Sequence, residues 1–173
     1  EAAYECSKKG IKVHPEIMIP FIMEAKELAY LKKEIEEEIE ILFEEIGERV
    51  EYKLGTMIEI PRACLLADEI AEHADFFSFG TNDLTQMSMG LSRDDSVKFL
   101  DDYREKGIWE GEPFYSIDTK SVTKLVKIAL DNAKPVKPDL KIGVCGEHGG
   151  DPKSIEFFEN NNFDYISCSS FRI

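Results

Sequence analysis

The stretch Phe76–Gln86, FFSFGTNDLTQ, reads as the end of a buried strand followed at once by a polar turn. Its opening residues are apolar between Asp75 and Gly80, a pattern typical of a buried strand. Asn82 and Asp83 follow the break at Gly80, so two polar side chains stand at the carboxyl end of the strand. In α/β folds ligands bind at that end, because the loops vary while the sheet holds them in place. For a single strand, the simpler interpretation is that one of the two only caps the next helix.

Four more short apolar segments are predicted as strands, and two of them also end in reactive side chains. Gly55–Glu59 ends in an acid, and Lys141–Cys145 ends in a thiol that Gly-Glu-His-Gly-Gly follows. The other two predicted strands are Ile17–Pro20 and Asp164–Ser167. Three similar strand ends make a common ligand site a better interpretation than three unrelated helix caps.

Apolar residues spaced three or four apart predict helices between these strands. Glu1–Gly10 has the basic last turn and glycine stop of a helix end. The other predicted helices are Leu28–Ile46 with Gly47 near its end, Arg62–His73, Ser121–Ala133 with Pro135 and Pro138 as its stop, and Pro152–Asn160.

Strands that alternate with helices are typical of parallel βαβ units. No glycine-rich dinucleotide motif follows the first strand and no Walker-type lysine loop is present, so nucleotide binding has no support. A complete (β/α)8 barrel usually takes about 250 residues. About five βα units in 173 residues therefore predict an α/β fold that is the C-terminal part of a TIM barrel, with residues 1–173 as one partial domain.

Residues 90–117 interrupt this alternation with a long segment that is rich in Asp, Gly and aromatic residues. It carries the only tryptophan, Trp109. Loops of this length are usually functional lids or disordered segments, and the aromatic content favours an ordered lid.

Composition and charge exclude some classes of function. A net charge of −14 argues against a nucleic-acid partner. No apolar run reaches membrane-spanning length and no basic-then-apolar leader is present, so we expect a soluble protein of the cytoplasm or of an organellar stroma, with no membrane partner. The cysteines show no metal-type spacing and are expected to be reduced thiols; they are Cys6, Cys64, Cys145 and Cys168.

If the strands are neighbours in one barrel, Glu59, Asp83 and Cys145 converge on its mouth. Glu59 and Asp83 are hard oxygen ligands suited to Mg²⁺, which typically takes one or two carboxylates and leaves its other positions to water and substrate. Cys145, beside Gly146, could be exposed enough to move a proton. Two rival interpretations stay open: a zinc pair of Cys145 with His148, which lacks two further soft ligands, and a Cys–His nucleophile pair, which lacks an orienting group.

Four stretches of the sequence closely resemble one family. They are MIEIPRA (Met57–Ala63), FFSFGTNDLTQM (Phe76–Met87), GVCGEHGGDP (Gly143–Pro152) and DYISCSSFR (Asp164–Arg172). From about Pro15 to its end, the chain resembles the C-terminal domain of the pyruvate, phosphate dikinases, within the wider family of phosphoenolpyruvate-utilising enzymes. Phosphoenolpyruvate synthase and enzyme I of the sugar phosphotransferase system share the Gly-Thr/Ser-Asn-Asp-Leu-Thr-Gln core. The Glu-His-Gly-Gly sequence and residues 103–118 look more like the dikinases.

This resemblance implies roles for the residues at the strand ends. Glu59 and Asp83 would coordinate Mg²⁺, which bridges the carboxylate and enolate oxygens of phosphoenolpyruvate or pyruvate. Gly80, Thr81 and Asn82 would line the substrate site together with Asp83, and Cys145 would give or take the proton at the substrate methyl carbon. In the full enzyme, ATP, phosphate and pyruvate would be converted to AMP, diphosphate and phosphoenolpyruvate.

The resemblance also implies partners outside this sequence. The phosphoryl group would travel to or from a histidine on another domain of the same full-length chain, because none of His14, His73 and His148 sits in a motif of that kind. The family's substrate-binding arginines come from earlier barrel strands. We therefore expect a fragment that is inactive by itself. The alternative from another class is a non-catalytic half-barrel that self-associates through its open sheet edges, and these edges also favour a homo-oligomer.

Overall fold

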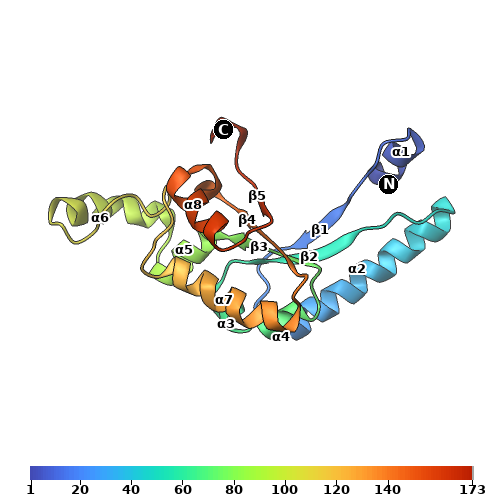
Figure 1. Cartoon of the computed structure of the whole chain (residues 1–173), viewed down its shortest axis with the longest axis horizontal. Coiled ribbons are helices and arrows are strands. Elements are labelled where there is room, and N and C mark those ends of the chain that lie inside the picture. The colour runs from blue at the N-terminus through green and yellow to red at the C-terminus, as the bar shows by residue number, and fades with distance from the viewer. Residues whose placement is uncertain (173) are drawn as a thin grey trace.

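The computed structural model describes residues 1–172 and shows helices alternating with the strands of one sheet (Figure 1). The helices are α1 (Ala2–Lys8), α2 (Ala25–Ile46), α3 (Pro61–Leu65), α4 (Ala67–Ala71), α5 (Thr81–Met89), α6 (Arg93–Glu105), α7 (Val122–Val136) and α8 (Pro152–Asn160). The strands are β1 (Glu16–Ile19), β2 (Lys53–Ile58), β3 (Phe76–Gly80), β4 (Lys141–Cys145) and β5 (Tyr165–Ile166), and two short 3-10 turns, η1 (Glu147–Gly150) and η2 (Ser170–Arg172), follow the last two strands.

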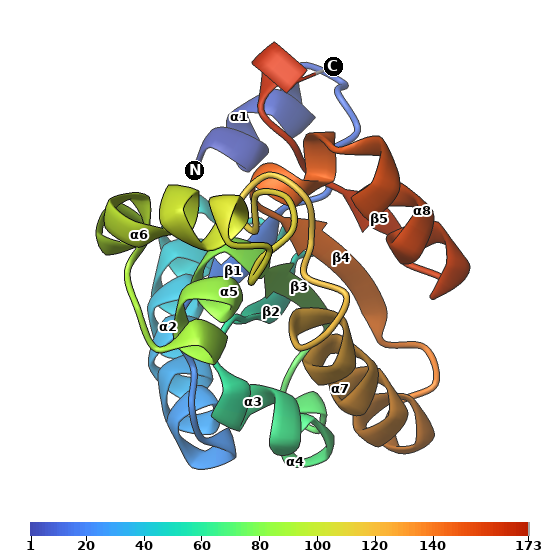
Figure 2. The ribbon, with the colours of Figure 1, turned by 90° about the vertical axis from the view of Figure 1, so that its left-hand side faces the viewer.

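All neighbouring strands of the sheet are parallel, and their order in space is their order in the chain, β1-β2-β3-β4-β5. An unreversed order is the winding of a (β/α) barrel, whereas doubly wound sheets reverse it at a switch point. Helices α2, α3, α4 and α7 lie on one side of the sheet (Figures 1 and 2). The predicted fold class, an α/β partial barrel, is confirmed.

The strand register separates the two faces of the sheet. Paired residues in parallel strands point to the same face, and the pairs Ile58↔Phe79 and Phe79↔Val144 belong to the face that packs on the helices. Fully or almost fully buried apolar side chains form this layer: Leu54, Ile58, Phe77, Phe79, Ile142 and Val144. The opposite face corresponds to the interior of a barrel, and it carries every second residue, including Ser78, Gly80 and Cys145.

Two glycines on this inner face make room for aromatic rings from neighbouring strands. A Cβ atom on Gly143 would lie 2.0 Å from the ring of Tyr165, and one on Gly55 would lie 2.5 Å from the ring of Phe76. Any larger side chain at these positions would displace the rings, so glycine is required by close packing.

Two of the helices differ from those predicted. The expected helix Arg62–His73 is two five-residue helices, α3 and α4, that separate at Leu66, where the backbone leaves helical geometry (φ −106°, ψ 23°). The prediction that Pro135 stops a helix is wrong, because α7 continues to Val136. A proline in the last turn removes only one backbone N–H donor from the helix, so a single further residue can follow.

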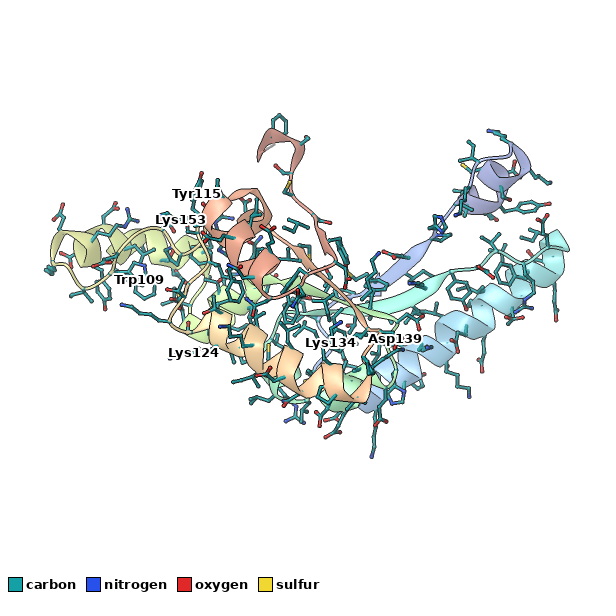
Figure 3. The ribbon with its side chains drawn as sticks, in the orientation of Figure 1. Trp109, Tyr115, Lys124, Lys134, Asp139 and Lys153 are labelled. Atoms are coloured by element: carbon teal, nitrogen blue, oxygen red, sulfur yellow. The ribbon has the colours of Figure 1, made fainter. Side chains whose placement is uncertain are left out.

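The insertion, residues 90–117, is not a plain loop. It contains α6, whose N-cap Ser92 accepts a hydrogen bond from the Asp95 N–H at 3.2 Å. At its end, the Ile117 N–H donates to Ser154 Oγ on α8 at 2.9 Å. Trp109 of the insertion and Lys153 of α8 line a pocket of about 380 Å³ (Figure 3). The function of this segment as a lid stays a prediction.

Two further expectations, on the state of the cysteines and on membrane-spanning helices, can be compared with the structure. All four cysteines are free thiols; Cys64 is buried and Cys168 is exposed. Within residues 1–172, no helix combines the length and the apolar character that a membrane crossing needs.

Candidate active site at the carboxyl end of the sheet

Glu59 follows β2 directly and lies buried, with 2% of its surface exposed. Its Oε1 accepts a hydrogen bond from the Phe21 N–H at 2.7 Å. Its Oε2 lies against the end of β3, where a Cβ atom on Gly80 would come within 2.5 Å of it. Gly80 is therefore required at this position because the Glu59 carboxylate occupies the space beside it.

The bond from Phe21 depends on an unusual backbone conformation. Phe21 has φ +58°, and among the described residues only Asn162 is another non-glycine residue with positive φ. The left-handed conformation costs a residue with a Cβ roughly 1–2 kcal/mol. Such strain persists where the surroundings determine the geometry, and here it accompanies the N–H bond that holds Oε1 of Glu59.

Asp83 lies in the first turn of α5, one strand along from Glu59. Its Oδ1 accepts a hydrogen bond from Gln86 Nε2 at 3.0 Å. The cap of α5 is Gly80, and no side chain caps this helix. The alternative that Asn82 or Asp83 serves only as a helix cap is therefore wrong.

The Glu59 and Asp83 carboxylates lie close enough to affect each other. Burial raises the pKa of Glu59, the Phe21 N–H opposes this, and repulsion from the Asp83 carboxylate adds to the rise. Among residues 1–172, no three His, Cys, Asp or Glu side chains gather as a metal site, so this pair could supply only two protein ligands. Two converging carboxylates fit the needs of Mg²⁺, which fills its remaining positions with water or substrate.

Cys145 ends β4 on the same inner face and pairs in register with Gly80. Its side chain is half-buried, with Sγ 3.7 Å from the carbonyl oxygen of Phe79. Burial is the main cause that raises the pKa of Cys145; a hydrogen bond with Ser78 opposes this, and the charges of Glu59 and Asp83 add to it. The thiol therefore keeps its proton at neutral pH. The three strand-end groups predicted from the sequence come together in the structure.

The loop after Cys145 packs against the start of α5. Gly146 has φ +122°, and a Cβ atom there would lie 2.9 Å from Thr81 Oγ1. The Glu147 N–H donates to Asn82 Oδ1 at 3.1 Å. Thr81 and Asn82 thus fasten the Cys145 loop to the helix that carries Asp83.

A pocket of about 250 Å³ opens beside this contact, and it is lined by Asn82, Gly146, Glu147, Ser167, Cys168 and Ser169. The last three residues follow β5 and are not among the site residues predicted from the sequence. Their signal was the family-like stretch DYISCSSFR at the fifth strand end. A larger pocket, about 710 Å³, lies at the opposite, amino end of β1 and β2, away from Glu59 and Cys145.

His148 is fully buried, and both of its ring nitrogens have partners. Nδ1 lies 2.7 Å from Thr81 Oγ1, and Nε2 lies 2.9 Å from the carbonyl oxygen of Pro113. A carbonyl can only accept, so Nε2 donates to Pro113. Because neither nitrogen is directed to Cys145, the zinc pair and the Cys–His nucleophile pair are both wrong. Instead, His148 ties the insertion to the helix of the site.

Comparisons with known proteins show which family the chain resembles. The chain matches the family described as "PEP-utilising enzyme, PEP-binding domain" over residues 1–173. It is 51% identical over 173 residues to a chloroplastic pyruvate, phosphate dikinase of Mesembryanthemum crystallinum, and 52% identical over 174 residues to a pyruvate, phosphate dikinase of Clostridium symbiosum. Both alignments take in 100% of this chain but only 18% and 20% of these relatives, so the chain spans about a fifth of their length.

Proposed function

Because the chain belongs to the family of PEP-utilising enzymes and matches its PEP-binding domain over the whole length, we propose that its strand-end residues form part of a site that interconverts phosphoenolpyruvate and pyruvate. The observation that carries this proposal is the convergence of Glu59, Asp83 and Cys145 from three neighbouring units of one parallel sheet. Two acids and a protonated thiol are the groups that enolate chemistry needs.

Glu59 and Asp83 are the residues that would hold Mg²⁺. When bound, the ion would stabilise the negative charge of the enolate oxygen. The Phe21 N–H keeps Oε1 of Glu59 in place, and Gln86 does the same for Oδ1 of Asp83. The two carboxylates would therefore meet the ion in a preformed orientation, which reduces the reorganisation that binding requires.

Cys145 is the group proposed to move the proton. When the phosphoryl group leaves phosphoenolpyruvate, the enolate remains, and its methylene carbon must gain a proton to form pyruvate. The Cys145 S–H bond breaks, a C–H bond forms, and the thiolate is left; in the reverse direction the thiolate removes a methyl proton. The raised pKa suits the thiol to giving this proton. Removing a methyl proton requires the thiolate, which a cation held by Glu59 and Asp83 would favour by offsetting the two carboxylate charges that raise the pKa.

The whole protein is proposed to act as a pyruvate, phosphate dikinase. Its reaction would convert ATP, phosphate and pyruvate to AMP, diphosphate and phosphoenolpyruvate, with the phosphoryl group carried by a histidine on another domain. The dikinase names of both relatives support this choice over phosphoenolpyruvate synthase or enzyme I. Because the chain spans about a fifth of these relatives, we expect it to be inactive alone. A cytoplasmic or stromal location stays a prediction.

The test follows the methyl protons of pyruvate in the full-length protein. Cys145→Ala and Cys145→Ser should abolish their exchange with solvent and also net turnover, because alanine has no acidic proton and serine is too weak an acid. Nucleotide-dependent phosphorylation of the remote histidine should survive. An alanine variant that exchanges these protons at the normal rate would show that another group is the acid.

The carboxylates are tested in the same protein. Glu59→Gln and Asp83→Asn should each lower turnover by orders of magnitude, and Glu69→Gln, at an exposed position on α4, is the matched control. Turnover like that of the wild type in both site variants at saturating metal would show that Glu59 and Asp83 are not the metal ligands.

A further inference from the structure

Gln86 connects the Asp83 carboxylate to the insertion. It lies one turn after Asp83 on α5, and its Nε2 donates to Asp83 Oδ1 at 3.0 Å. Its Oε1 accepts from the Arg93 N–H, the first residue of α6, at 2.9 Å. Between these points the chain leaves α5 through Gly90, whose left-handed conformation (φ +67°) turns it back toward Gln86.

The two bonds determine which way the amide of Gln86 points. A backbone N–H can only donate, so the oxygen of the amide must face Arg93. The NH₂ group is then left to face Asp83, whose ionised carboxylate can only accept. The insertion therefore selects the amide orientation that presents a donor to Asp83, and the opposite orientation would lose both hydrogen bonds.

Resting on the proposed function of Asp83 as a metal ligand, we propose that Gln86 is a positioning residue through which the insertion sets the orientation of the Asp83 carboxylate. With Oδ1 held by the amide, the rotation of the carboxylate is restricted and Oδ2 remains to meet a cation. Partners of this kind fix the orientation of metal ligands, and their loss typically lowers metal affinity by about 10–100-fold. The insertion would then act on the site through a fixed hydrogen bond, in addition to any covering role.

The competing explanation is that Gln86 only caps α6. The first N–H groups of a helix have no partner inside it, and the Gln86 oxygen satisfies one of them. A capping role predicts that loss of Gln86 weakens the insertion and leaves metal binding unchanged. A positioning role predicts that metal binding itself is weakened.

The experiment measures Mn²⁺ binding to the full-length protein, without nucleotide, by calorimetric titration. Asp83→Asn identifies the part of the titration that belongs to this site. Gln86→Met keeps the length of the side chain and removes both hydrogen bonds, and it should weaken Mn²⁺ binding at that site about tenfold or more. The same variants are compared by thermal unfolding, because a capping role alone would change only this second measurement.

A pair of variants at Arg93 tests the connection without changing Gln86. Arg93→Pro removes the N–H that orients the amide, and proline is well tolerated as the first residue of a helix. The extended conformation of Ser92 (φ −77°, ψ 156°) is also the one that precedes proline. Arg93→Ala removes the same side chain, with its ion pair to Glu147 at 3.7 Å, but keeps the N–H. Mn²⁺ should bind more weakly to the proline variant than to the alanine variant.

The outcomes separate the two proposals. If Asp83→Asn leaves Mn²⁺ binding unchanged, the metal site itself is wrong. If Asp83→Asn loses the site while Gln86→Met binds Mn²⁺ like the wild type, only the positioning role is overturned. If Gln86→Met does not fold, the Arg93 pair decides, and equal affinities of its two members would overturn the positioning role.

Discussion

Glu59 combines burial, a neighbouring acid and a single strong hydrogen bond from the main chain. An ionised carboxylate in this position is destabilising for the folded protein unless a cation accompanies it. The residue therefore links the stability of the domain to pH and to metal, and this link can be measured without any assay of turnover.

The raised pKa of Glu59 predicts the direction of a pH effect. Between the ordinary carboxyl value of 4.5 and the raised pKa, the folded state binds more protons than the unfolded state. The free energy of unfolding of the metal-free protein should therefore fall as pH rises through this range. Glu59→Gln removes the cost of ionisation, so at neutral pH the metal-free variant should unfold at a higher temperature than the wild type.

The comparison is made by calorimetry of the full-length protein at neutral pH and below the ordinary carboxyl range. At the lower pH the difference between variant and wild type should disappear, since Glu59 is then protonated in both states. Added Mg²⁺ should raise the unfolding temperature of the wild type but not of Glu59→Gln. A metal-free variant that is less stable than the wild type at neutral pH contradicts this account.

At the scale of elements, the site depends on the contact between the end of β4 and the start of α5. At Gly146, both the φ of +122° and the space beside Thr81 exclude a side chain. The position of the Cys145 thiol relative to Asp83 thus depends on one glycine that carries no chemistry of its own.

Gly146→Ala should destabilise the domain by about 1–3 kcal/mol, because it adds backbone strain and a close contact. It should also slow the exchange of pyruvate methyl protons, since relief of the contact moves the Cys145 loop. Gly107→Ala is the matched control: Gly107 also has positive φ, at +67°, but has no atom within 4 Å of an added Cβ. Equal effects of the two substitutions on exchange would mean that the contact with Thr81 is unimportant.

Buried hydrogen bonds attach the insertion to the rest of the domain. His148 joins Thr81 of α5 to Pro113 of the insertion. Ser154 of α8 accepts a hydrogen bond from the Ile117 N–H. A buried polar group that loses its partner costs about 1–3 kcal/mol, so detaching this segment should be unfavourable.

His148→Leu should therefore lower the free energy of unfolding by about 1–3 kcal/mol and speed proteolytic cleavage within residues 90–117. The measurement is limited proteolysis with mass spectrometry of the fragments. His14→Leu, at an exposed position, is the control and should cleave like the wild type. Unchanged cleavage in His148→Leu would show that the insertion is held mainly by other contacts.

At the scale of the whole molecule, the described residues form an open five-stranded sheet with β1 and β5 at its edges. Unpaired strand edges favour association with another chain. The inner face adds apolar surface there, because Met18 of β1 is 41% exposed. These features support the alternative of a self-associating module as far as the isolated polypeptide is concerned.

The polypeptide of residues 1–173, expressed by itself, should form dimers or larger assemblies at micromolar concentration. Sedimentation velocity over a range of concentrations measures this, and thermal unfolding should be broad or dependent on concentration. A compact monomer that melts cooperatively would count against the prediction. Self-association together with a lack of turnover would not decide between the two classes of function, so the Cys145 test in the full-length protein remains the deciding one.

The sequence by itself determined the fold class, the bounds of β3, β4 and α8, and the meeting of Glu59, Asp83 and Cys145. These features depend on local patterns: apolar runs and helical spacing are set by neighbouring residues, and parallel βα units bring all strand ends to one edge. The alternation of strands and helices is therefore enough to predict that Glu59, Asp83 and Cys145 converge, although it gives no distance between them.

The tertiary structure alone decided how these groups are held. No local pattern in the sequence indicates three of these features. They are the Phe21 N–H that donates to Glu59, the position of His148 between Thr81 and Pro113, and the break of the helix at Leu66. The predictions that pair His148 with Cys145 are wrong for this reason: a spacing of three residues suggests a partnership that the fold does not make. Each of these bonds joins residues about 35 to 67 positions apart, and such contacts are determined by how the elements pack, which local spacing does not encode.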